Sequence, residues 1–284
     1  GTTIVVRYVL GTAWDVAFVI GSLLVATGPT VITPIMNVVP VRERVASTLE
    51  TEGVVNDVTA AILAIAVFEY VLLESRGFPR LLWEFTTRFG LGILVGCAVA
   101  AAVWYVLRHA SLSVENAPQN ARMIVLVSSL TMYGIAEVVA TEAGIAAVAA
   151  GGFVLGNTDL PYRDTIEQFK GDVSLLVISF VFITLASLLS LDNLLSLGLG
   201  GIVVVVVVAV VIRPALVLLC TVGERLTFRE RLFISFLGPR GIIPASVATL
   251  FALELQPQNP TAATTLVGTV FLVIFATVVF EGGV

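Results

Sequence analysis

The sequence has little of what a soluble surface or a catalytic site requires. Only 12% of its 284 residues are charged, it has two cysteines and one histidine, and 58% of it is hydrophobic. A soluble globular domain carries about 25% charged residues, so that class is excluded. The single histidine, His109, lies in a polar stretch, and no GxxxxGK[ST] or TVGYG run occurs. These absences argue against an enzyme, an ATP-driven pump and a potassium filter.

Long apolar runs dominate what is present. Their approximate bounds are 13–37, 48–74, 82–107, 122–139, 142–156, 172–191, 194–221, 231–254 and 262–280. A helix crosses the hydrocarbon core with about 20 residues, and none of these runs alternates apolar and polar residues as a membrane barrel strand does. We therefore expect an all-α polytopic membrane protein with about nine transmembrane segments, forming one transmembrane domain over 1–284. Since the chain begins without methionine and stops just after an apolar run, we expect a fragment of a longer protein.

Basic residues are unevenly divided between the two sides that nine crossings define. One side has only three basic residues, Arg76, Arg80 and Arg88. The opposite, basic-rich side has nine: Arg42, Arg44, Arg108, Arg122, Arg163, Lys170, Arg225, Arg229 and Arg231. By the positive-inside rule the basic-rich side is cytoplasmic. This predicts a protein of the plasma membrane whose C-terminal end lies in the cytoplasm.

Two runs contain the same proline pattern. The first holds GPTVITP at 28–34, and the eighth holds GPRGIIP at 238–244. Proline lacks an N–H and clashes with the carbonyl four residues earlier, so each pattern predicts a broken helix, near 26–34 and near 236–244. Because these runs cross the membrane in opposite senses, they indicate an inverted repeat with an ion site near the midplane.

An acidic residue lies within the second apolar run. Asp57 follows Asn56, and Glu52 and Gly53 lie one helical turn earlier on the same face. Small residues continue this face: Ala60, Ala61 and Ala64. Burial disfavours a charged carboxylate unless a cation lies against it, which is the behaviour that proton and cation exchange requires. The structural alternative is that Asp57 is a buried hydrogen-bond partner without a transport role.

Two arginines also lie within apolar runs. Arg240 follows the second break, where we expect it either to compensate a half-helix end or to act near the ion. Arg213 is the one charge inside run 194–221, and we expect it to pair with an acid missing from this fragment. The other acids near segment ends are interpreted as rim residues: Asp15, Glu69, Glu74, Glu137, Asp192 and Glu254.

Three motifs, in this order and spacing, resemble those of the NhaP-type branch of the monovalent cation:proton antiporters. They are Thr27-Gly28-Pro29, the stretch EGVVND at 52–57, and GPRG at 238–241. The family patterns are Thr-Asp-Pro, Glu-Ser-x-x-Asn-Asp and Gly-Pro-Arg-Gly. The resemblance covers essentially the whole chain and implies segments five to thirteen of a thirteen-helix transporter, with a partial inverted-repeat fold and two crossed, broken helices.

The resemblance also implies roles for individual residues. Asp57 would be the exchanging carboxylate that binds Na⁺ in transport, and Asn56 would orient it. Thr27 would contribute its hydroxyl or backbone, and Glu52 would lie behind the groups that touch the ion. Glycine replaces the family's aspartate at Gly28 and its serine at 53, which leaves selectivity open.

The same resemblance implies an activity and partners. We expect a secondary active antiporter that exchanges Na⁺, or K⁺ or Li⁺, for H⁺ by alternating access, with no cofactor and no nucleic acid. The Asn-Asp pair implies electroneutral exchange, and the family implies a homodimer. A nucleotide-binding regulatory domain after the last helix is also found in some relatives. The alternatives are a channel-like cation pathway and a membrane sensor that binds an ion without transporting it.

Overall fold

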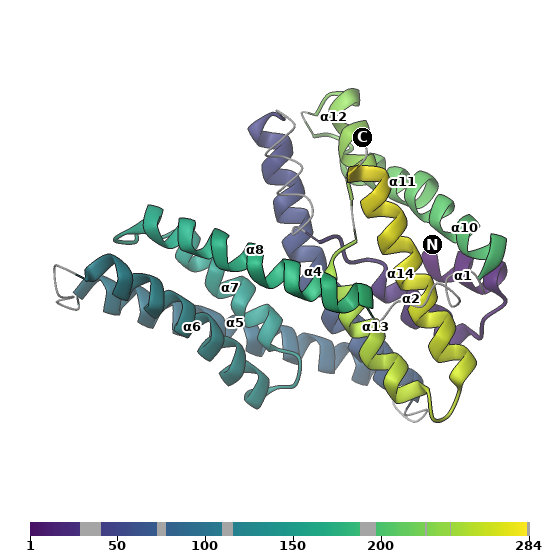
Figure 1. The fold of residues 1–284 in the computed structure, drawn as a ribbon, viewed down its shortest axis with the longest axis horizontal. Helices are drawn as coiled ribbons and strands as arrows, with labels where there is room; N and C mark the ends of the chain where they lie inside the picture. Colours follow the sequence, from purple (N-terminus) through teal and green to yellow (C-terminus); the bar gives the residue numbers. More distant parts are fainter. Residues whose placement is uncertain are drawn as a thin grey trace. The chain divides into compact units, whose positions relative to one another are not determined.

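The computed structural model describes residues 1–28, 41–72, 78–109, 116–187, 197–224, 226–238 and 240–282. Every regular element in these ranges is helical, as the sequence predicts, and no strand occurs within them. The chain divides into two compact units (Figure 1). One comprises Gly1–Glu74 with Phe182–Val284, and the other comprises Ser75–Val181.

The first unit contains the candidate ion site. Its helices are α1 (Thr2–Leu10), α2 (Trp14–Leu23), α4 (Glu43–Leu72), α10 (Gly198–Val206), the π-helix η1 (Val207–Ile212), α11 (Arg213–Cys220), α12 (Phe228–Phe236), α13 (Ile242–Leu255) and α14 (Pro260–Gly282). Helices α13 and α14 pack as a pair, α1 packs on α2, and α4 packs on α2 and α13. The elements around α4 therefore come from both ends of the chain.

The second unit contains α5 (Phe78–His109), α6 (Ala117–Val139), α7 (Gly144–Gly156) and α8 (Arg163–Ser187), whose last turns fall in the first unit. Helices α5, α6 and α7 pack on one another. Glycines of α5 allow the closest approach, because a Cβ at Gly92 would lie 2.6 Å from the Ala143 carbonyl oxygen and one at Gly96 would overlap the Ala147 carbonyl. Small residues four apart allow helix backbones to approach in this way.

Five helices are long and apolar enough to cross a membrane within the described ranges. They are Glu43–Val71, Leu82–His109, Ala117–Val139, Gly198–Cys220 and Pro260–Phe280. Three shorter apolar helices, α2, α7 and α13, accompany them. The predicted apolar runs are thus recovered as helices, although their bounds differ.

The first predicted run, 13–37, contains helix α2, which begins at Trp14, one residue from the predicted start. Helix α2 ends at Leu23, and the amides of Val25 and Ala26 donate to carbonyls only three residues earlier, at 3.3 Å each. Residues 26–28 are not helical, and the rest of this predicted break lies outside the described residues. Pro29 lacks an N–H for the Val25 carbonyl and disfavours helical backbone at Gly28, and the non-helical residues 26–28 fall where the sequence predicts the first break to begin. The sequence interpretation missed α1, which at nine residues is too short to read as a span.

The second predicted break is confirmed. Helix α12 ends at Phe236 and α13 begins at Ile242. Residues 237, 238, 240 and 241 between them are not helical, and Pro239 lies outside the described residues. Helix α12 starts with a capping box, in which the Thr227 hydroxyl accepts from the Glu230 amide and the Glu230 carboxylate accepts from the Thr227 amide. These hydrogen bonds hold the pKa of Glu230 below its usual value.

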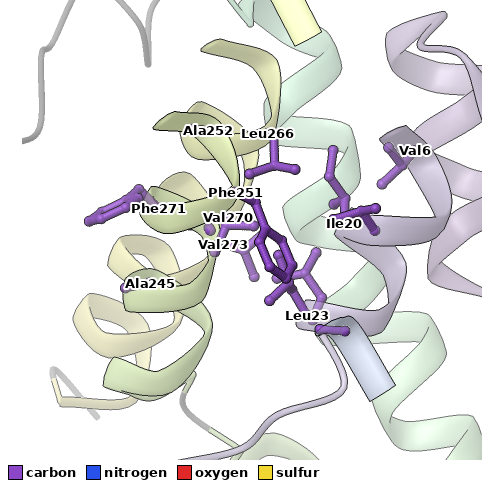
Figure 2. Packing of buried hydrophobic residues seen from close by; sticks show 14 of the residues in the cluster. Val6, Ile20, Leu23, Ala245, Phe251, Ala252, Leu266, Val270, Phe271 and Val273 are labelled. Carbon is purple, nitrogen blue, oxygen red and sulfur yellow. The ribbon is translucent and has the colours of Figure 1, made fainter. Parts of the chain in front are cut away.

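An apolar core joins seven helices of the first unit, namely α1, α2, α4, α10, η1, α13 and α14 (Figure 2). Figure 2 shows Ile20 and Leu23 of α2 facing Phe251 of α13 and Leu266 of α14. The Phe251 ring stacks on the ring of Phe68 with centroids 3.8 Å apart, which fixes α13 against α4. This packing holds the second half of the broken helix against the helix that carries Asp57.

Candidate cation site

Asp57 lies at the midpoint of the 30-residue helix α4 and is only 7% exposed. Its Oδ1 atom is buried and has no hydrogen-bond partner among the described residues. Because an unpartnered buried carboxylate oxygen is costly, this atom is the part of the site best suited to receive a cation or a proton.

The neighbour of Asp57 connects α4 to the end of α2. The Asn56 side-chain amide donates to the Thr27 hydroxyl at 3.0 Å and to a Glu52 carboxylate oxygen at 3.2 Å. Thr27 is buried beyond the last turn of α2. Three of the residues singled out from the sequence, Thr27, Glu52 and Asn56, are therefore joined by hydrogen bonds, and Asn56 lies directly beside Asp57 in the chain.

The acid that pairs with Arg213 lies within this chain. Its guanidinium forms a two-point ion pair with Glu52, from Nη1 to Oε1 and from Nη2 to Oε2 at 3.1 Å. The prediction that the partner of Arg213 is missing from the chain was wrong. The partners are 161 residues apart in sequence, and they meet because α4 and α11 both pack on α12.

The guanidinium of Arg213 also contacts the backbone at the end of α12. Its Nη2 donates to the carbonyl oxygens of Ile234 at 3.4 Å and Leu237 at 3.3 Å, which have lost helical partners at the break. A Cβ on Gly238 would lie 2.6 Å from the Arg213 Cζ atom. The glycine of the GPRG motif is thus required for the guanidinium to fit.

Arg240 likewise donates to a backbone carbonyl where α2 ends. Its Nη1 donates to the Ala26 carbonyl at 3.1 Å, just beyond the end of α2, and its backbone amide donates to the Thr277 hydroxyl at 3.4 Å. A positive charge at the C-terminal end of a helix complements the helix dipole. Each broken helix therefore ends against a buried arginine that comes from another part of the chain.

The two glycines that depart from the family pattern are both buried. Gly28 lies in the non-helical stretch after α2, and Gly53 lies on α4 one turn before Asp57. The alanines that follow on this face, Ala60 and Ala64, have no exposed surface. The sequence prediction of a small-residue face that is packed closely by other elements is confirmed.

The sequence interpretation missed a π-helix next to the site. Residues Val207–Ile212 form η1 between α10 and α11, so Arg213 follows directly after it. The available signal was Pro214, which lacks the N–H that an α-helix would use at this position. A π-turn changes the direction in which the following side chains point, and such turns recur at functional sites.

The donor set suits a monovalent cation. A carboxylate, a hydroxyl and backbone carbonyls beside broken helices are hard oxygen donors that can replace part of an ion's hydration shell. Among the described residues, Asp57 has the one carboxyl group with a buried oxygen that lacks a hydrogen-bond partner. The nearby carboxylate of Glu52 is paired with Arg213.

Comparison with known proteins identifies the family. The model of the sodium/hydrogen exchanger transmembrane family matches residues 1–283. "Na(+)/H(+) antiporter 1" of Methanocaldococcus jannaschii is 28% identical over 94% of this chain and 66% of its own length. "K(+)/H(+) antiporter NhaP" of Alkalimonas amylolytica is 25% identical over 99% of this chain and 48% of its own length. The chain therefore spans less than two thirds of the length of these curated relatives.

The fold has a solved counterpart. The structure of the sodium proton antiporter MjNhaP1 from Methanocaldococcus jannaschii at pH 8 matches the whole chain with a TM-score of 0.79, at 23% identity and over 74% of its own chain. At that identity the match establishes the fold, which is the antiporter fold expected from the sequence. The chain belongs to the sodium/hydrogen exchanger family of transmembrane proteins.

Proposed function

We propose that the protein is a secondary active antiporter that exchanges a monovalent cation for a proton at Asp57 by alternating access. The observation that carries this proposal is the buried Asp57 carboxyl at the middle of α4, with one oxygen that no described residue hydrogen-bonds. Membership of the sodium/hydrogen exchanger family supports it. Residues 1–284 would then be the transmembrane exchanger domain.

The exchange follows from one carboxyl group having two possible partners. When ionised, Asp57 binds a partly dehydrated cation together with the Thr27 hydroxyl and backbone oxygens near Val25. The Thr27 oxygen accepts one hydrogen bond from Asn56 and keeps a second lone pair for the cation. Protonation of Asp57 removes its charge and releases the cation, so the two ligands exclude each other. The site then reopens to the other side of the membrane.

Arg213 and Arg240 position the residues of this site without contacting the ion. Arg213 fixes Glu52, and Glu52 in turn accepts from the Asn56 amide that orients the Thr27 hydroxyl. Arg240 compensates the end of α2 at Ala26 and balances the charge of Asp57 when no cation is bound. These arginines are positioning and charge-compensating residues.

The cation is Na⁺ in this proposal, with K⁺ or Li⁺ as the alternatives. Relatives of this chain are named as Na⁺/H⁺ antiporters and as K⁺/H⁺ antiporters, so the names alone do not choose. Gly28 and Gly53 remove the aspartate and serine of the family pattern, and the cation would consequently be selected by Asp57, Thr27 and the backbone.

Asn56 supports electroneutral exchange, because the family resemblance associates an Asn-Asp pair with one-for-one stoichiometry. An exchange rate that an imposed membrane potential leaves unchanged would support this assignment, and a rate that follows the potential would refute it. We further propose that the protein lies in the plasma membrane with its C-terminal end in the cytoplasm, which the distribution of basic residues supports. The family resemblance supports a homodimer.

The test is exchange by the full-length protein in proteoliposomes. A cation gradient should drive a pH change that disappears in Asp57→Asn and persists in Asp15→Asn, whose acid is exposed at the start of α2. Unchanged exchange in Asp57→Asn would refute the assignment. Cation current without proton movement would favour the channel-like alternative, and cation binding without turnover would favour the sensor.

A further inference from the structure

The second unit contains a cavity that the proposed exchange does not use. It has a volume of about 380 Å³ and lies between α6, α7 and the first half of α8. Cavities that bind small ligands have volumes of about 300–1,000 Å³. All of its lining residues fall between Arg122 and Ser174, within the second unit, whereas Asp57 and its partners belong to the first.

The two ends of this cavity differ in character. Three basic residues, Arg122, Arg163 and Lys170, line one end against a single acid, Glu167. All three belong to the set that the positive-inside rule assigns to the cytoplasmic side. This end of the cavity therefore carries a net positive charge and belongs to the side that the sequence predicts to be cytoplasmic.

The other end is apolar. It is lined by Met132, Val148 and Gly152. Along α6, Met132 lies ten residues after Arg122, which is a rise of about 15 Å at 1.5 Å per residue. That is about half of a hydrocarbon core of about 30 Å, which is the depth of one leaflet.

The three basic side chains differ in how many interactions they make with other residues of the protein. Arg163 is held by Glu167 at 3.0 Å and by the Gly156 carbonyl, and the Arg122 guanidinium lies 5.6 Å from the centre of the Phe169 ring. Lys170 is exposed and has no hydrogen bond or ion pair within the described ranges. Lys170 is therefore the charge most available to a ligand, with Arg122 beside it on the neighbouring helix.

We propose that this cavity binds one anionic phospholipid of the cytoplasmic leaflet. Its phosphate would lie against Lys170 and Arg122, and one acyl chain would extend past Gly152 toward Met132. Basic pockets between transmembrane helices on the cytoplasmic side recognise anionic headgroups in this way. A second copy of the chain fits less well, because a symmetric contact would bring the same basic residues together.

The test is native mass spectrometry of the full-length protein in detergent with equal amounts of dioleoyl phosphatidylglycerol and dioleoyl phosphatidylcholine. The wild type should retain the anionic lipid preferentially. Lys170→Gln and Arg122→Gln should each reduce that preference about fivefold, since each basic residue near an anionic headgroup contributes about this factor. Arg108→Gln removes a charge of the same predicted side outside the cavity and should change nothing.

A steric variant tests the acyl-chain end. A Cβ at Gly152 meets no atom within 4 Å, so Gly152→Leu fills the cavity without moving the backbone, and retention of the lipid should be lost. Gly134→Leu is the matched control, because a Cβ there also meets nothing and the residue lies outside this cavity. Equal retention of both lipids, wild-type behaviour of Lys170→Gln and Gly152→Leu, or displacement of the lipid by equimolar inorganic phosphate would overturn the proposal.

Discussion

The carboxylate of Glu52 and the guanidinium of Arg213 form a two-point ion pair that joins the first third of α4 to the start of α11. The pair is largely enclosed, with the Arg213 side chain 10% exposed and that of Glu52 25% exposed. Through the Asn56 amide it extends to Thr27. One ion pair therefore connects three separate stretches of the chain at the candidate site.

Removing one partner of this pair should be worse than removing both. Arg213→Gln leaves a largely enclosed Glu52 charge without compensation and should lower the free energy of unfolding by about 3 kcal/mol. The double variant Arg213→Gln with Glu52→Gln should recover a substantial part of this loss. Denaturant unfolding of the four proteins in a double-mutant cycle measures the coupling.

Glu50→Gln is the control for that cycle, because Glu50 lies two residues earlier on α4 and is exposed. It should change stability by less than about 0.5 kcal/mol. If the two single substitutions proved strictly additive, the ion pair would have no energetic role and the network built on it would have to be abandoned.

Gly238→Ala should disable exchange through Arg213. The new Cβ would lie 2.6 Å from the Arg213 Cζ atom, so the guanidinium must move away from Glu52. The Arg213 side chain is long and flexible enough to move, so we expect Gly238→Ala to break the ion pair with Glu52 and to leave the backbone packing largely unchanged. Exchange in proteoliposomes should drop to the level of Arg213→Gln, whereas Gly134→Ala, where a Cβ meets nothing within 4 Å, should exchange normally. Normal exchange in Gly238→Ala would show that the guanidinium position is not critical.

Gly96→Ala should loosen the second unit. A Cβ at this position would overlap the Ala147 carbonyl of α7, and backbone cannot yield as a side chain can. We expect a loss of about 2 kcal/mol in the stability of the second unit, in the range typical of overpacking. Gly90→Ala is the matched substitution on α5, where a Cβ meets nothing within 4 Å. Equal thermal stability of the two variants would contradict the close helix contact.

Much of this fold could be predicted from the sequence, because apolar runs are local and proline acts on its own helix. The break before Ile242 and the packed small-residue face of α4 were foreseen in this way. The short helix α1 could not be predicted, because nine residues are too few to identify a span.

The tertiary relationships of the site could not be predicted, for a different reason. Nothing local to Arg213 indicates an acid 161 residues earlier, so the partner was assigned to a missing segment. The close approach of α5 to α7 did leave a signal, namely Gly92 and Gly96 four residues apart, and it was overlooked. Pro214 likewise marked the irregular helix η1 without specifying its geometry.

The central claim is that one carboxyl group, Asp57, holds either a cation or a proton and never both. Na⁺ binding to the full-length protein, measured by isothermal titration calorimetry across a pH series, tests it most directly. In the range where protons occupy the site, the apparent Kd should rise about tenfold for each unit that the pH falls, with one proton released per cation bound. Asp57→Asn should abolish binding. An apparent Kd that does not change with pH, or wild-type binding by Asp57→Asn, would contradict the account.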